Sequence, residues 1–137
     1  MIHYTFHNVG EPPFFVALTP WFEGVSKKLF SSIEAIRYVF CSDDFLLEMN
    51  RAQLGHDYYT DIITFDLRQA FREPLDCEVY ISIDRVTENA ATFNCTFAEE
   101  LKRVMAHGLL HLSGLNDSTE EEKKTMREAE NNLIKSI

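Results

Sequence analysis

The chain has 137 residues, of which 45% are hydrophobic and 26% charged, which is typical of one soluble globular domain with a single core. Its net charge of −9 excludes nucleic-acid binding through bulk electrostatic attraction but leaves room for a small local basic patch. No segment reaches the roughly 20 apolar residues of a membrane span, and the N-terminus lacks the basic start and apolar run of a signal peptide.

The first half of the sequence alternates between strand and helix patterns. Ile2–Phe6 is short, aromatic and β-branched, which predicts a strand. Apolar residues recur at helical spacing over Trp21–Ile33, and Pro20 is placed to open that helix at its first turn. Ile36–Ser42 predicts a second strand, and its final serine is a suitable N-cap for the helix "DDFLLEMNRAQL", which Gly55 would end.

The second half begins with the two strongest strand patterns, Asp61–Leu67 and Cys77–Ile83, which are rich in Ile, Val, Phe and Tyr. A loop containing Pro74 separates them, and Asp84–Phe93 predicts a short helix. We expect Glu78 and Asp84 to form structural hydrogen bonds.

Two capping boxes define the helices of the C-terminal part. Thr96 and Glu99 precede an apolar stripe that continues to Leu112, and Gly114 is a plausible stop because glycine tolerates a left-handed turn. Ser118 with Glu121 predicts the start of a final helix by the same spacing. The whole pattern predicts an α+β fold, with about four strands and about five helices in a single domain over residues 1–137.

The three cysteines, Cys41, Cys77 and Cys95, are widely spaced and form no Cys-x-x-Cys pair. Neither a disulfide framework nor a cysteine zinc site is indicated. We interpret them as buried free thiols of a protein in the reducing cytoplasm.

A candidate metal site lies in "HGLLHLSGLND". His107 and His111 are four residues apart, so on a helix they point from one face and can bind one tetrahedral cation. A sharp turn at Gly114 can bring Asp117 back as a third ligand. Three protein ligands leave one position open, which is typical of catalytic rather than structural zinc. The competing interpretation is a coincidental pair of helix histidines, which the glycine and the acid make less attractive.

The residue after the first histidine is Gly108, where zinc proteases carry the glutamate that takes a proton from the attacking water. Peptide hydrolysis by that route is therefore disfavoured. Zinc alone can still polarise a bound oxygen and lower the pKa of water towards about 7, so a substrate with its own charge could be served.

These residues resemble the YbeY family of metal-dependent endoribonucleases. The family signature His-Gly-x-Leu-His-Leu-x-Gly stands at residues 107–114, and "TDIITF" at residues 60–65 matches a second block. "CEVYIS" matches a third block loosely, with Cys77 and Glu78 in place of Gly and Asp. The resemblance covers about Asn50 to Asp117.

The resemblance implies a zincin-like metal helix with one Zn²⁺, and cleavage of single-stranded RNA during small-subunit (16S) rRNA maturation and ribosome quality control. It implies ribosomal RNA or the small ribosomal subunit as partner in the cytoplasm, with no membrane association. Thr60 begins the block that lines the site in the family, which makes it a candidate for substrate binding. The oligomeric state stays open.

The sequence departs from the family at two positions. The third ligand is usually histidine, where this chain has Asp117, and the family's catalytic arginine is replaced by Leu54. Arg51, one helical turn earlier, and His56, in the following loop, are the candidates to replace it.

RNA needs a cationic path to the metal, and the sequence offers few candidates for it. Lys102 and Arg103 are near enough to the motif to contact a phosphate. We expect at least some of six candidates to surround a cleft that ends at His107 and His111: Arg51, His56, Arg68, Arg72, Lys102 and Arg103.

Two alternatives remain. The protein could be a ribosome-assembly factor with a mainly structural zinc, which Leu54 and the acidic charge favour. It could also be a metallohydrolase of another substrate such as a peptide, against which Gly108 speaks.

Overall fold

The computed structural model describes residues 2–12 and 15–135, and its centre is a four-stranded sheet in the order β1-β2-β4-β3. The strands β1 (Ile2–Phe6), β2 (Ile33–Cys41) and β4 (Leu75–Ser82) run parallel. The edge strand β3 (Ile62–Asp66) pairs antiparallel with β4. Four strands and five helices in the described part of the chain confirm the α+β prediction.

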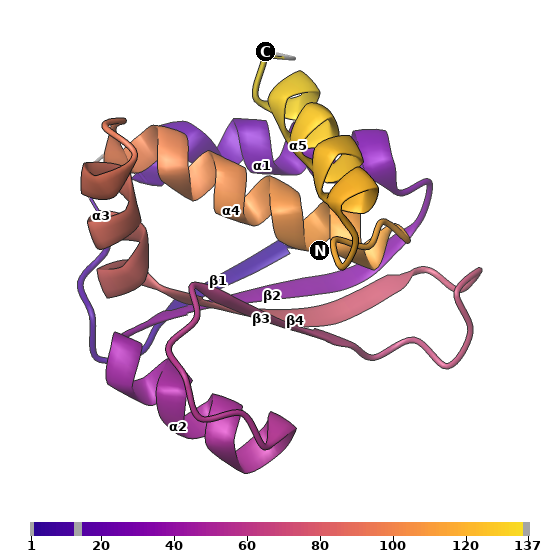
Figure 1. Cartoon of the computed structure of the whole chain (residues 1–137). Helices are drawn as coiled ribbons and strands as arrows, with labels where there is room; N and C mark the ends of the chain where they lie inside the picture. Colours follow the sequence, from indigo (N-terminus) through magenta and orange to yellow (C-terminus); the bar gives the residue numbers. More distant parts are fainter. Residues whose placement is uncertain (1, 13–14, 136–137) are drawn as a thin grey trace.

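The helices cover the sheet unevenly. Helices α1 (Phe15–Leu29), α4 (Phe97–Leu112) and α5 (Glu120–Lys135) lie over one face, and α2 (Asp43–Leu54) lies over the other (Figure 1). Helix α3 (Ile83–Thr92) stands at the end of the sheet and packs against α4. Helix α4 therefore lies between the sheet and α5, with packed elements on several sides. None of the helices described is both long and apolar enough to span a bilayer.

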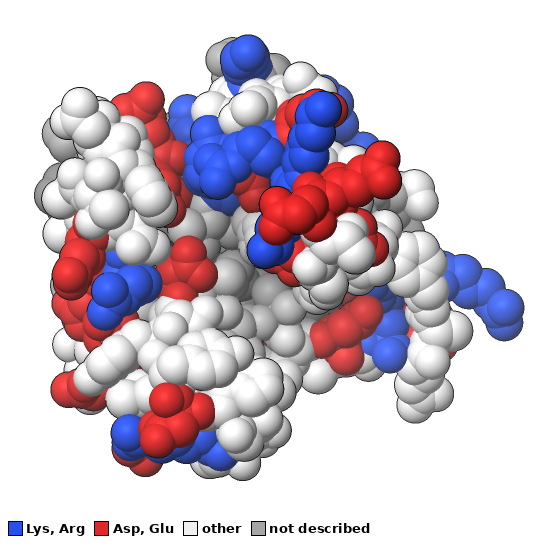
Figure 2. All heavy atoms as spheres, viewed as in Figure 1, with Lys and Arg blue, Asp and Glu red and all other residues white. Residues whose placement is uncertain are grey.

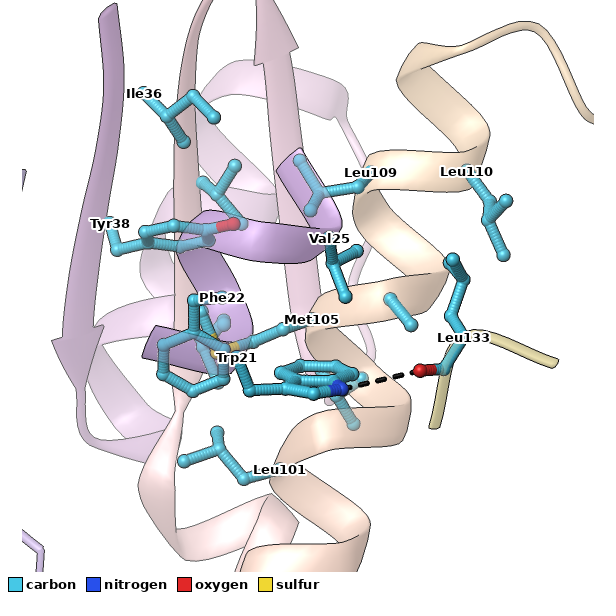
Figure 3. Packing of buried hydrophobic residues seen from close by; sticks show 14 of the residues in the cluster. Trp21, Phe22, Val25, Ile36, Tyr38, Leu101, Met105, Leu109, Leu110 and Leu133 are labelled. Carbon is cyan, nitrogen blue, oxygen red and sulfur yellow. Dashed lines mark hydrogen bonds between the residues drawn. The ribbon is translucent and has the colours of Figure 1, made fainter. Parts of the chain in front are cut away.

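The main core fills the space between the sheet and the layer of α1, α4 and α5 (Figure 3). Phe22 of α1, Tyr38 of β2 and Met105 of α4 are fully buried there. The two apolar side chains, Phe22 and Met105, each contribute about 1.5–3 kcal/mol by leaving water. Trp21 also donates an indole hydrogen bond of 3.2 Å to the carbonyl of Leu133, which fastens α5 to α1.

Helix α1 begins earlier than the sequence predicts. Pro20 lies inside it rather than in its first turn, so that prediction was wrong. A proline has no N–H for the carbonyl four residues back. Here the Thr19 hydroxyl donates to that carbonyl, of Val16, at 2.9 Å and so supplies the missing donor.

Two other predicted boundaries also shift. The first predicted helix was extended to Ile33, but this residue begins β2 because it pairs with Leu75 of β4. The last helix is capped by Thr119 and Glu122 instead of Ser118 and Glu121. The Thr119 hydroxyl accepts from the Glu122 amide at 3.1 Å, and the Glu122 carboxylate accepts from the Thr119 amide at 3.0 Å. Both pairs have capping-box spacing, so the sequence alone offers two registers.

The expected caps of α2 and α4 are confirmed. The Ser42 side chain accepts from the Phe45 amide, and Gly55 adopts the left-handed conformation with φ of 68°. Thr96 and Glu99 form both hydrogen bonds of a capping box, at 3.1 and 2.9 Å. This cap fixes where α4 starts, and thus which face its histidines present.

Candidate metal centre and adjoining clefts

The two histidines of α4 are each held through Nδ1 by an oxygen. The Nδ1 atom of His107 lies 2.8 Å from Oε2 of Glu130, and that of His111 lies 3.0 Å from the carbonyl oxygen of Leu115. A carboxylate and a carbonyl oxygen only accept, so Nδ1 carries the proton in both rings. When the rings are neutral, Nε2 carries the lone pair that could bind a metal, as in histidines that bind metals.

Asp117 reaches the first histidine as the sequence predicts. The chain turns at Gly114, with φ of 113°, and Oδ2 of Asp117 lies 3.4 Å from Nε2 of His107. Two ligands about 2.0–2.2 Å from one zinc ion would stand at about this separation. His111 lines the same cleft as this pair. No group of three or more His, Cys, Asp or Glu side chains in the described ranges is already arranged to hold a metal ion, so the three-ligand set stays a prediction.

The donor set itself fits zinc. It offers two imidazoles whose Nδ1 protons are engaged by oxygen atoms, and one carboxylate on the cleft side. These are the ligand types and the supporting contacts found in zinc sites.

Carboxylates surround His107 and favour a positive charge there. The hydrogen bond to Glu130 raises the pKa of His107, and the charges of Asp117 and Asp61 act in the same direction. Burial alone would raise the pKa of Glu130, but hydrogen bonds from His107 and Arg103 lower it on balance. Burial raises the pKa of Asp61, against the opposing effect of His107. A proton on His107 or a metal ion bound beside it would offset the negative charge of these carboxylates.

Gly108 lies where α4 approaches β3 closely. A Cβ atom at this position would lie 2.7 Å from Cδ1 of Ile62. A larger residue here would require the flexible end of the Ile62 side chain to turn away.

Two clefts meet at His107 and Asp117. The first, which we name the α2-side cleft, has a volume of about 600 Å³. It is lined by Asn50, Leu54, His56, Tyr58, Thr60, Ile62, Ile63, Thr64, His107, Gly108, His111, Asp117 and Ser118. The second, the α5-side cleft, has a volume of about 580 Å³. It is lined by Asp61, Ile62, Asn89, Phe93, Cys95, Glu100, Arg103, Val104, His107, Asp117, Arg127 and Glu130.

His56 and Thr60 lie in the α2-side cleft, where the sequence interpretation expected them. The Tyr58 hydroxyl is 3.0 Å from Nδ1 of His56, and the two rings stack at 5.2 Å. Buried Asn50 donates to the Tyr58 carbonyl at 2.9 Å and fixes the loop. Leu54, at the family's arginine position, lines the same cleft.

The expected cationic path is largely absent. Arg51 lines neither cleft and is paired with Glu48 and Asp57. Lys102 also lies outside both clefts, with Nζ 5.5 Å from the centroid of the Trp21 ring. In the part of the chain that the structure describes, no Lys or Arg lines the α2-side cleft.

Arg68 and Arg72 likewise line neither cleft, so His56 and Arg103 are the members of the expected set that do. The Arg68 guanidinium is buried between Asp66, at 2.8 Å, and the carbonyl of Leu112, at 2.8 Å. Arg103 does line the α5-side cleft, but its guanidinium is held by Glu130 and Asn131, each at 3.0 Å.

Sequence reasoning missed Glu130 and Arg127, both on α5. The buried positions of this helix are Met126, Glu130 and Leu133, so an acid occupies the apolar face. A glutamate with a helical spacing of four and three residues from buried apolar neighbours was the signal that could have found it.

The structure is an α+β fold in which His107 and Asp117 lie where two clefts meet and His111 lines one of them. The sequence model described as Endoribonuclease YbeY matches residues 17–137, and the chain belongs to this family.

Several relatives agree with this assignment. Endoribonuclease YbeY of Cytophaga hutchinsonii is 50% identical over 80% of this chain and 76% of its own. That of Bacteroides thetaiotaomicron is 45% identical over 85% of this chain and 83% of its own. The solution structure of TM1509 from Thermotoga maritima covers 98% of this chain and 87% of its own, with a TM-score of 0.69 and 29% identity.

Proposed function

We propose that this protein is a metal-dependent endoribonuclease that cuts single-stranded RNA in small-subunit rRNA maturation and ribosome quality control. Its place would be the cytoplasm, and residues 1–137 would act as one hydrolase domain. Membership of the endoribonuclease family supports the reaction class. The observation that carries the proposal is the engaged Nδ1 atom of each α4 histidine, with Asp117 3.4 Å from the free nitrogen of His107.

His107, His111 and Asp117 would hold one zinc ion. When bound, zinc supplies Lewis-acid chemistry to a phosphodiester and offsets the negative charge that develops in the reaction. The three side chains come from α4 and the turn after it, so one short segment of the chain would supply all three ligands. Glu130 and the Leu115 carbonyl keep the imidazoles in the tautomer that a metal needs.

His56 is the better candidate to replace the family's lost arginine. Tyr58 holds its Nδ1 atom, which leaves Nε2 for a phosphate oxygen or for a proton in transfer. Arg51 would first have to leave two carboxylates, and it lines neither cleft. Thr60 would contact the substrate backbone on the same wall.

The test measures metal content, melting temperature and cleavage of single-stranded RNA, with and without chelator. Chelator should abolish cleavage and lower the melting temperature of the native protein, because the metal binds only the folded state. His111→Ala should lose the metal and show no chelator shift. His56→Ala should keep the metal and lose most of the activity. Equal chelator shifts in native protein and His111→Ala would reject this site.

A ribosome-assembly factor with a mainly structural zinc is the second candidate. The α2-side cleft favours it, since the described residues that line it include no lysine or arginine. A protein of this kind would bind zinc and the small ribosomal subunit but would leave RNA intact at every zinc concentration. Retained zinc with no cleavage therefore separates it from the nuclease.

A further inference from the structure

The α5-side cleft lies on the opposite side of His107 and Asp117 from His56. Ile62, His107 and Asp117 line both clefts, so the candidate metal centre is the point where they join. A substrate that occupied only the α2-side cleft would leave this second hollow, of about 580 Å³, without a role. Figure 2 shows a hollow near the middle of this face, with basic side chains along its upper rim.

An aromatic ring and an amide stand on the α3 wall of this cleft. Phe93 is the C-cap of α3, lines the cleft and is 64% exposed, so its ring is accessible to a ligand. Asn89 lies one turn earlier and lines the same wall. Within the described residues its side-chain amide has no hydrogen-bond partner. A flat ring beside a free amide suits a nucleobase, which stacks on the first and pairs with the second.

A free cation stands on the opposite wall. Arg127 of α5 lines the cleft and is exposed. No ion pair or hydrogen bond holds it in the described chain, although burial raises the pKa of the nearby Glu100 and the charge of Arg127 opposes that rise. Arg103 beside it is already held by Glu130 and Asn131. The guanidinium of Arg127 is thus the available group for a phosphate, which arginine binds through its fork of N–H donors.

The carboxylates of the cleft do not block an anion at its rim. Glu100 and Glu130 are each only 5% exposed, and Glu130 is paired with Arg103 and His107. Asp61 is half-buried beside Ile62 and lies on the β3 wall. Asp117 also lines the cleft, with its side chain 45% exposed, and it belongs to the candidate metal centre. The exposed charge is therefore positive on the α5 wall and negative towards Asp61 and Asp117.

We propose that the α5-side cleft is a nucleotide subsite for single-stranded RNA, with a base stacked on Phe93 and a phosphate held by Arg127. This inference rests on the proposed endoribonuclease function and extends it. The RNA strand crosses the candidate metal centre, with the neighbouring nucleotide on the stacked pair of His56 and Tyr58 in the α2-side cleft. A duplex cannot enter, because each base must leave its stack to reach its cleft.

The experiment measures binding of a fluorescein-labelled, single-stranded 2′-O-methyl-oligouridylate to the zinc-loaded protein by fluorescence anisotropy at several salt concentrations. Arg127→Ala should weaken binding several-fold and reduce the slope of log Kd against log salt by about 0.7, the value for one phosphate contact on a single strand. Lys124→Ala is the matched control, because Lys124 is an exposed cation of the same helix that lines neither cleft. It should keep the native slope.

Phe93 supplies the second arm of the test. Phe93→Ala should weaken binding about tenfold, because stacking on one aromatic side chain is lost, and Phe93→Tyr should restore it. Both residues are exposed, so the melting temperatures should match the native protein and exclude a folding defect.

The outcomes separate the two proposals. If the native protein cuts RNA while Arg127→Ala and Phe93→Ala bind like Lys124→Ala, the subsite is wrong and the nuclease stands. If the native protein neither cuts RNA nor binds the oligonucleotide, the proposed function fails and the subsite fails with it.

Discussion

Replacing Glu130 with glutamine tests how far one buried carboxylate prepares His107 for a metal. Its Oε2 accepts from His107 at 2.8 Å, and its Oε1 accepts from Arg103 at 3.0 Å. Glutamine keeps the shape but has one acceptor oxygen and one donor nitrogen. Either Arg103 or His107 must then face the N–H group of the glutamine, and neither of them faces a negative charge any longer.

The expected loss of stability depends on how exposed Arg103 and His107, the two partners of Glu130, are. A buried donor without an acceptor costs about 1–3 kcal/mol. The side chains of Arg103 and His107 are 28% and 30% exposed, so water can partly replace the lost contact. We expect Glu130→Gln to destabilise the metal-free protein by about 1–2 kcal/mol, at the lower end of that range. Zinc affinity should fall about 10- to 100-fold, as when other partners of metal-bound histidines are removed.

The assays are urea unfolding in the presence of chelator, and zinc titration in competition with a coloured chelator. Glu128→Gln is the control, because it makes the same chemical change at an exposed position of the same helix. A zinc affinity of Glu130→Gln within twofold of the control would show that the carboxylate does not orient a metal ligand.

Three further predictions concern the packing, the pH response and the thiols. Gly108→Ala should change the free energy of unfolding in urea by less than about 1 kcal/mol, because the flexible end of Ile62, 2.7 Å from the new Cβ, can turn away while helix propensity improves. A loss of more than about 2 kcal/mol that Gly108→Ala/Ile62→Val recovers would show that Ile62 cannot move. In chelator, the folded-state pKa of His107 lies above its usual 6.5, so its contribution to stability is full below pH 6.5 and disappears as pH rises through the folded value. Urea unfolding across this range should show the decline, and it should be shallower in Glu130→Gln. Cys95 should react with a disulfide reagent in the native state while the two buried cysteines, whose pKa burial raises to about 12, react only after unfolding.

Local signals made much of the fold predictable. Ser42, Gly55 and the Thr96–Glu99 pair act within one turn of helix, so the sequence around them contains the whole cause. The start of α1 was missed because Pro20 is usually incompatible with a helix interior, and the Thr19 hydroxyl that compensates for it is a detail of one side chain. Ile33 was missed because pairing with β4 overrides its helical spacing.

The residues of the candidate site also fall into those that local sequence predicts and those that depend on the packing of distant elements. His107 and His111 follow from the geometry of a single helix, and Asp117 follows from one glycine turn. Glu130 and Arg127 come from another helix, and their approach to His107 depends on how α5 packs across α4. The spacing of residues along the chain does not predict that packing. The exception is Glu130, an acid at a buried position of α5.

The dependence of His107 on α5 has a consequence for the order in which the protein is made. Strand β3 and helix α4 are synthesised first, and both histidines are in place when α4 has formed. Helix α5 brings the carboxylate that holds His107 and the indole-bound carbonyl that fastens the helix to α1. A nascent chain that ends between α4 and α5 therefore has metal-binding side chains but no oriented pair. If the protein is the proposed nuclease, the first histidine of its site gains its carboxylate partner only once α5 has packed against α4.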